Sequence, residues 1–196
     1  MIGNLYLFFN VLEYFTIHEL CNKLYPNNMK VAKNLVHLIH AITCIMLIYF
    51  DQIQLMSINT YAFYAYDIMC IVWHFKTNQI PFIIHHIMSI YTMYYVSDDI
   101  IGQHVVTTLL MFEISNLPLY IYYHFKTNGC SNIFYISIVE IIAYIGIRIV
   151  WFNCYVHSNM DDIMDHSSYI IKCIFVLISI MNIVWSIKLS KPFLFH

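Results

Sequence analysis

Long apolar runs, separated by short polar segments, fill almost the whole chain. A helix needs about 20 mostly apolar residues to cross the hydrocarbon core of a bilayer. Several runs approach that length, and we expect each of them to form one membrane-spanning helix. The runs are Ile2–Leu20, Val31–Phe50, Leu55–Phe75, Ile80–Val96, Ile100–Phe125, Ile133–Val156 and Ser168–Leu189. The pattern therefore predicts an all-α, polytopic membrane helix bundle of about seven transmembrane helices.

The composition supports this prediction. Of the 196 residues, 61% are hydrophobic and 10% are charged, whereas soluble domains carry about 25% charged residues. No polar stretch exceeds a short loop, which excludes a soluble domain between the runs. The lysines are dispersed among short loops, so no nucleic-acid partner is expected. The cysteines are scattered as well, and no pair of them has metal-ligand spacing.

Charged residues in the predicted loops separate by sign when the chain crosses the membrane seven times. One side then carries the loop lysines, namely Lys23, Lys30, Lys33, Lys76, Lys126, Lys188 and Lys191. The other side carries the loop aspartates, namely Asp51, Asp98, Asp99, Asp161, Asp162 and Asp165. Because loop lysines favour the cytosolic side, we expect a lumenal N-terminus and a cytosolic C-terminus.

Several ionisable side chains lie inside the apolar runs, where an unpartnered polar group costs several kcal/mol. Intramembrane ionisable residues are candidates for functional sites by default. Converting position to depth at about 1.5 Å per residue places polar groups of several spans near one level, toward the cytosolic leaflet. They are His37, His40, Asp67, His74, His85, His86, Glu113 and Asn182. A lone transmembrane histidine is more often a hydrogen-bonding partner between helices, and that alternative stays open for each of them.

Short landmarks follow one another in order along the chain: His40-Ala41, Tyr66-Asp67, His85-His86, Glu113-Ile114-Ser115-Asn116-Leu117-Pro118, Arg148 and Asn182-Ile183-Val184-Trp185. In this order they resemble the TLC family of multipass, endoplasmic-reticulum-type lipid proteins. The resemblance divides the chain into an N-terminal transmembrane helix and loop at residues 1–33, a TLC domain at residues 34–191 and a short tail at residues 192–196. It also implies that six of the helices form a barrel around a central cavity.

Ceramide synthases of this family join a fatty acyl-CoA to a sphingoid base as an amide. The resemblance therefore implies acyl transfer at His85 and His86, with Asp67 fixing the tautomer of a histidine. Met111–Asn116 lacks the His-Asp pair and the second Asp of the synthase motif. We accordingly favour the non-synthase branch, which acts in lipid binding, sensing or membrane lipid homeostasis. The N-acyltransferase is the alternative, and acyl-CoA would then be its co-substrate.

The candidate catalytic residues are thus His85, His86 and Asp67, and the candidate polar residues of a lipid cavity are His40, His74, Glu113, Ser115, Arg148 and Asn182. We expect a sphingolipid or fatty acyl ligand, an endoplasmic reticulum or related endomembrane location, and no firmly implied cofactor. A homo-oligomer is compatible with this interpretation. Metal chemistry is disfavoured because His37-x-x-His40 and His85-His86 fall short of the repeated histidine boxes of membrane di-iron enzymes. A proton pathway through the intramembrane acids is a further alternative.

Overall fold

Helices make up all of the regular structure in the described parts of the chain. The computed structural model describes residues 2–26, 28–73, 80–93, 101–130, 133–166 and 168–194. The elements are α1 (Ile2–Leu24), α2 (Met29–Tyr49), α3 (Ile53–Trp73), α4 (Ile80–Met93), α5 (Ile101–Thr127), α6 (Phe134–Ile145), the π-helical segment η3 (Gly146–Trp151), α7 (Phe152–Ser158), α8 (Met160–His166) and α9 (Tyr169–Leu194). The all-α prediction is confirmed for these residues.

Among the described residues, five helices are long and apolar enough to cross a membrane. They are Met29–Tyr49, Ile53–Trp73, Ile101–Thr127, Phe134–Ser158 and Tyr169–Leu189, and α4 is a shorter apolar helix. The chain is therefore a multipass membrane protein. Helix α1 has the length of a span but carries Glu13, Glu19 and Lys23, which lower its mean hydropathy. The full count of seven spans stays a prediction.

Local sequence explains where several helices begin and end. The side-chain oxygen of Asn28 caps α2 by accepting a hydrogen bond from the Val31 amide at 3.3 Å. At the end of α5, Gly129 adopts a left-handed φ of 73°. The amides of Gly129 and Cys130 bond back to the carbonyls of Lys126 and Phe125, which is the Schellman arrangement. Capped ends of this kind keep the turns between spans short.

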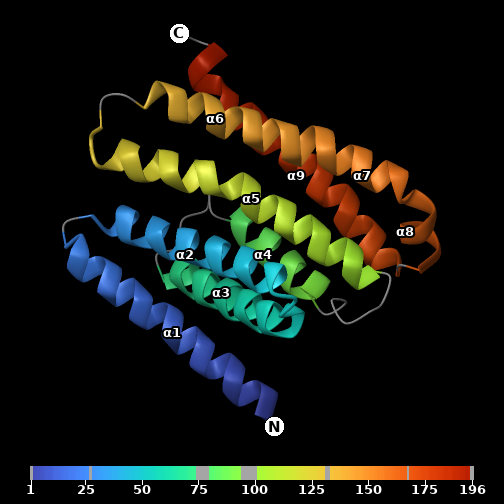
Figure 1. Cartoon of the computed structure of the whole chain (residues 1–196), viewed down its shortest axis with the longest axis horizontal. Coiled ribbons are helices and arrows are strands. Elements are labelled where there is room, and N and C mark those ends of the chain that lie inside the picture. The colour runs from blue at the N-terminus through green and yellow to red at the C-terminus, as the bar shows by residue number, and fades with distance from the viewer. Residues whose placement is uncertain are drawn as a thin grey trace.

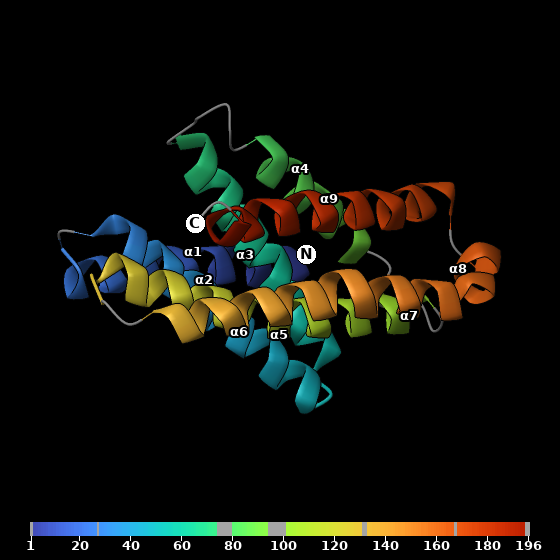
Figure 2. The same cartoon turned by 90° about the horizontal axis from the view of Figure 1, so that it is seen from above.

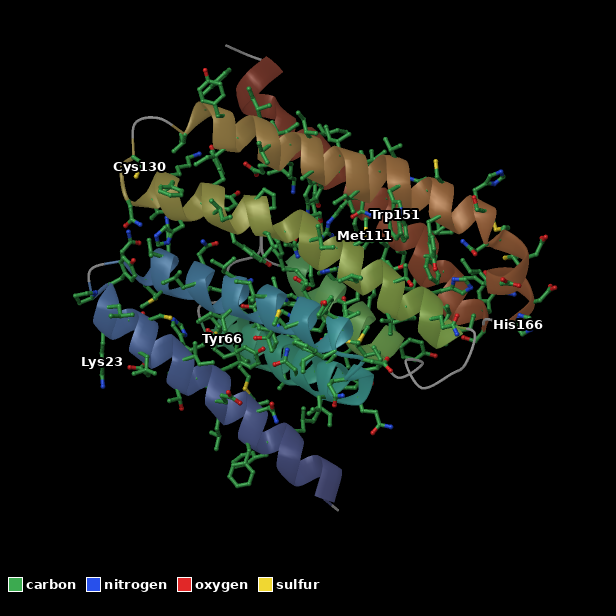
Figure 3. All side chains as sticks on the ribbon, viewed as in Figure 1. Lys23, Tyr66, Met111, Cys130, Trp151 and His166 are labelled. Atoms are coloured by element: carbon green, nitrogen blue, oxygen red, sulfur yellow. The ribbon has the colours of Figure 1, made fainter. Side chains whose placement is uncertain are left out.

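Helix α5 lies between α2 and α6, while α1 packs on the outside against α2 and α3 (Figure 1). In the view of Figure 2, α6 and α7 continue one another as a single rod through η3, with α9 running alongside. Tyr66 of α3 fills the space beside α1, where its hydroxyl lies 2.8 Å from His18 Nδ1 (Figure 3). Exposed Lys23, by contrast, points away from the bundle.

Cross-helix contacts bring the start of α2 and α4 to the same end of the bundle as the last turns of α5 and α9. The Asn34 side-chain amide donates to the Tyr120 carbonyl at 2.7 Å. The Phe82 and Trp185 rings stack with their centroids 5.7 Å apart. Lysines concentrate at these helix ends, and we call this end of the molecule the lysine end. Its lysines among the described residues of α2, α5 and α9 are Lys30, Lys33, Lys126 and Lys188.

Candidate functional site

A buried carboxylate, that of Asp67, joins three helices near the lysine end. Its Oδ1 atom lies 2.8 Å from Lys33 Nζ and 3.3 Å from His37 Nε2, both on α2. Its Oδ2 atom accepts a hydrogen bond from His86 Nε2 of α4 at 2.8 Å. Asp67 is only 2% exposed, and its partners compensate the charge that burial would otherwise make unfavourable.

The adjacent histidines of α4, His85 and His86, have different surroundings, since neighbouring positions on a helix point about 100° apart. An ionised carboxylate can only accept hydrogen bonds, so Asp67 holds the hydrogen on His86 Nε2. When the ring is neutral, Nδ1 therefore carries the free lone pair, and this buried atom has no partner among the described residues. His85 instead packs edge-on against Trp185, with centroids 5.3 Å apart. Its ring is hydrogen-bonded to no described residue.

A second buried acid faces His40, one level further from the lysine end. Glu113 Oε1 of α5 lies 3.8 Å from His40 Nε2 of α2. The opposite ring nitrogen of His40, Nδ1, lies 3.0 Å from the Tyr14 hydroxyl. Phe63 stacks on the same imidazole with centroids 3.8 Å apart, so the His40 ring is fixed on several sides.

Neutral groups hold the buried guanidinium of Arg148, which η3 presents to α5. Nε donates to Ser115 Oγ at 2.9 Å, and Nη2 donates to Asn116 Oδ1 at 2.8 Å and to the Phe112 carbonyl at 3.3 Å. The guanidinium carbon lies 4.3 Å from the centroid of the Phe112 ring, a cation–π distance. Asn182 of α9 donates to the Arg148 carbonyl at 3.0 Å. π-helical segments are often found at functional sites.

Asn116 connects the last two groups, because its side-chain nitrogen donates to Glu113 Oε2 at 3.3 Å while its oxygen accepts from Arg148. The sequence-predicted residues thus meet in three groups: Asp67 with His86, His40 with Glu113, and Arg148 with Ser115 and Asn182. His85 borders the same space without a hydrogen bond. His74 lies outside the described residues.

Sequence reasoning left three of these residues out of the candidate site: Lys33, His37 and Asn116. Lys33, His37 and His40 follow one another at spacings of four and three residues, so they share one face of α2. That spacing was the available signal. The sequence does not indicate that Ser115 and Asn116 of α5 are the residues that bind the Arg148 side chain.

Two pockets border these side chains. The outer pocket lies at the lysine end and has a volume of about 460 Å³. The inner pocket has a volume of about 100 Å³ and a largely apolar wall that includes Leu109, Phe112 and Phe175. Both pockets share His37, His85, His86, Asn116, Tyr120 and Arg148. The described residues contain no group of three or more His, Cys, Asp or Glu side chains placed to hold a metal ion.

The helices and the buried polar groups on two neighbouring levels define a polytopic membrane protein. The family model for the TLC domain matches residues 50–191, and the chain belongs to this family. The match includes Asp67, the histidine pair and Arg148, while α2 precedes it. Comparisons with curated proteins and with solved structures give no match.

Proposed function

We propose that the chain binds a membrane lipid in the outer pocket and acts in lipid sensing or membrane lipid homeostasis, as in the non-synthase branch of the TLC family. The observation that carries this proposal is the outer pocket, where Asp67, His86 and Arg148 come together from α3, α4 and η3. Its volume of about 460 Å³ falls in the range of small-molecule sites, roughly 300–1,000 Å³.

The two pockets together suit an amphiphile. The apolar wall of the inner pocket, whose volume is about 100 Å³, is a surface for a short part of a hydrocarbon chain. The cationic and amide groups of the outer pocket are partners for a polar headgroup. In the proposed arrangement the chain crosses the membrane seven times, and six helices of the TLC domain surround the ligand. The lysine end faces the cytosol because of the positive-inside rule, in the endoplasmic reticulum or a related endomembrane.

A second candidate function is acyl transfer from an acyl-CoA to a sphingoid base, and the free Nδ1 of His86 favours it. In that reaction the amine nitrogen attacks the thioester carbonyl while His86 Nδ1 removes its proton. The carbon–sulfur bond then breaks, the amide is left behind, and the departing thiolate takes the proton from the imidazolium. Asp67 stabilises the imidazolium between these two proton transfers through its bond to Nε2.

Lipidomics on cells that express the wild type or the variant H85A/H86A tests both candidates. The matched control is H157A/H166A, which removes two exposed histidines. Lipid binding or homeostasis predicts a change in membrane lipids with the wild type and the control that is absent with H85A/H86A. New ceramides, together with release of coenzyme A by the purified wild type, would establish the acyltransferase. If H85A/H86A gave the same lipid profile as the wild type, the site assignment would be wrong.

A further inference from the structure

The outer pocket carries an excess of positive charge over negative charge. Among its described lining residues are the cations Lys30, Lys33, Lys188 and Arg148 and one carboxylate, that of Asp67. Asp67 is paired with Lys33, which leaves the other three cations without an ion-pair partner among the described residues. From this imbalance we infer that the ligand of the outer pocket bears an anionic phosphate headgroup, an assignment that rests on the proposed lipid site.

Arg148 is a buried cation without a direct ion-pair partner among the described residues. The residue is 4% exposed, and a buried cation is ordinarily paired with an anion. Arg148 donates its hydrogen bonds to neutral oxygens of Ser115, Asn116 and Phe112, and its Nη1 atom bonds to no described residue. Glu113 is the nearest acid in the hydrogen-bonding network, but Asn116 stands between the two. An anionic ligand would supply the direct ion-pair partner that the described residues do not, since Arg148 lines both pockets.

Lys30 and Lys188 add two exposed ammonium groups at the mouth of the same pocket, one from α2 and one from α9. A phosphate offers several oxygens to such a set of donors, and guanidinium groups bind it in a bidentate manner. A carboxylate offers only two oxygens. The spread of cations from the buried Arg148 to the exposed lysines therefore favours a phosphate over the headgroup of a free fatty acid.

The test is a titration of the purified full chain in dodecyl maltoside micelles, with complexes counted by native mass spectrometry. The probes have one oleoyl chain each: lysophosphatidic acid, oleoyl-CoA, lysophosphatidylcholine and oleate. We expect the first two, whose phosphate headgroups carry a net negative charge, to bind about tenfold or more tightly than the other two. Lysophosphatidylcholine has a phosphate as well, but its choline cation cancels the charge, and oleate has a carboxylate instead. Tighter binding of lysophosphatidic acid than of oleoyl-CoA would assign the phosphate to a membrane phospholipid, and the reverse order would assign it to an acyl-CoA.

The matched variants are K30Q/K188Q and K23Q/K126Q, which remove the same charge from exposed positions inside and outside the pocket. Neither pair includes Lys33, so the ion pair with Asp67 stays intact. We expect K30Q/K188Q to reduce the preference for phosphate probes by about tenfold, and K23Q/K126Q to leave it unchanged. R148K, which keeps the charge but loses the guanidinium fork, should weaken the binding of the phosphate probes as well.

Equal affinities for lysophosphatidic acid and lysophosphatidylcholine would overturn the assignment of a net-anionic phosphate headgroup while leaving a lipid site in place. Equal losses in the two lysine pairs would show a general charge effect and would overturn it too. Binding of none of the four probes would contradict the proposed function itself.

Discussion

Asp67 and Arg148 are both charged, buried and close to one pocket, yet their surroundings are opposite in kind. Asp67 has Lys33, His37 and His86 within 3.3 Å or less, so the protein itself supplies its counter-charge. Arg148 contacts a hydroxyl, an amide and a backbone carbonyl. The first cluster contains a direct ion pair, and the second contains none among the described residues.

This difference predicts a structural role for the Asp67 cluster and a ligand-binding role for Arg148. A compensated carboxylate stabilises the packing of α2, α3 and α4 and fixes the orientation of the His86 ring. The guanidinium on η3, which has no direct ion pair among the described residues, is the group that we propose for the ligand. Substitutions at Asp67 should therefore lower mainly the free energy of unfolding, and substitutions at Arg148 should lower mainly the ligand affinity.

D67N should have the largest effect on stability. It removes the charged partner of Lys33, whose side chain is 32% exposed, and the charged acceptor of the buried His86. Hydrogen bonds to a charged group are worth about 1.5–3 kcal/mol each, so we expect a loss of about 3 kcal/mol or more. The check is the free energy of unfolding in detergent micelles. The control variant is D161N, which changes an exposed aspartate of α8. A D67N protein as stable as D161N would show that Asp67 does not hold the three helices together.

H86A should destabilise the protein more than H85A does. His86 donates a hydrogen bond to a charged group at 2.8 Å, which is worth about 1.5–3 kcal/mol. The edge contact of His85 with Trp185 is worth about 1 kcal/mol. The same unfolding measurement on the two single variants provides the check. Equal losses would mean that the two rings are equivalent despite their different contacts.

R148M should reduce ligand affinity more than it reduces the free energy of unfolding, which is the reverse of the expectation for D67N. It removes three hydrogen bonds that the guanidinium donates to neutral oxygens, and bonds of a charged group are worth about 1.5–3 kcal/mol each. It also removes the cost of burying a cation without a direct ion pair, so the net loss should stay below that of D67N. Affinity for oleoyl lysophosphatidic acid should fall about tenfold or more. Unfolding and binding measured on one preparation provide the check. A stability loss as large as that of D67N, with affinity unchanged, would reverse the assigned roles.

The sequence predicts most of the helices well, because lengths of apolar runs depend on local composition. Val31–Phe50 corresponds to α2 at Met29–Tyr49, and Leu55–Phe75 to α3 at Ile53–Trp73. The hydrophobic pattern does not reveal the π-helical segment, since Gly146–Trp151 lies within the same apolar run as the helices on either side. It therefore could not predict how the Arg148 side chain is presented to α5.

The candidate site could be predicted only in part. Burial of Asp67, His86 and Arg148 follows from ionisable groups within apolar runs, which must face the interior of a bundle. The identity of their partners depends on which helices are neighbours and on their relative rotation. Lys33 and Asp67 are far apart in sequence, and only the packing of α2 against α3 brings them to 2.8 Å. The chemical role assigned to each residue stays a prediction.

Photo-crosslinking tests the central claim of a lipid inside the bundle most directly. Cells expressing the full chain would receive a diazirine-labelled fatty acid, which they build into their own lipids, and the crosslinked residues would be mapped by mass spectrometry. A lipid in the pockets predicts crosslinks at inner-pocket residues such as Phe112 and Ile178, lost in H85A/H86A. Crosslinks confined to exposed apolar residues such as Val139 and Ile142 would mean that lipid only surrounds the protein, and would contradict the account.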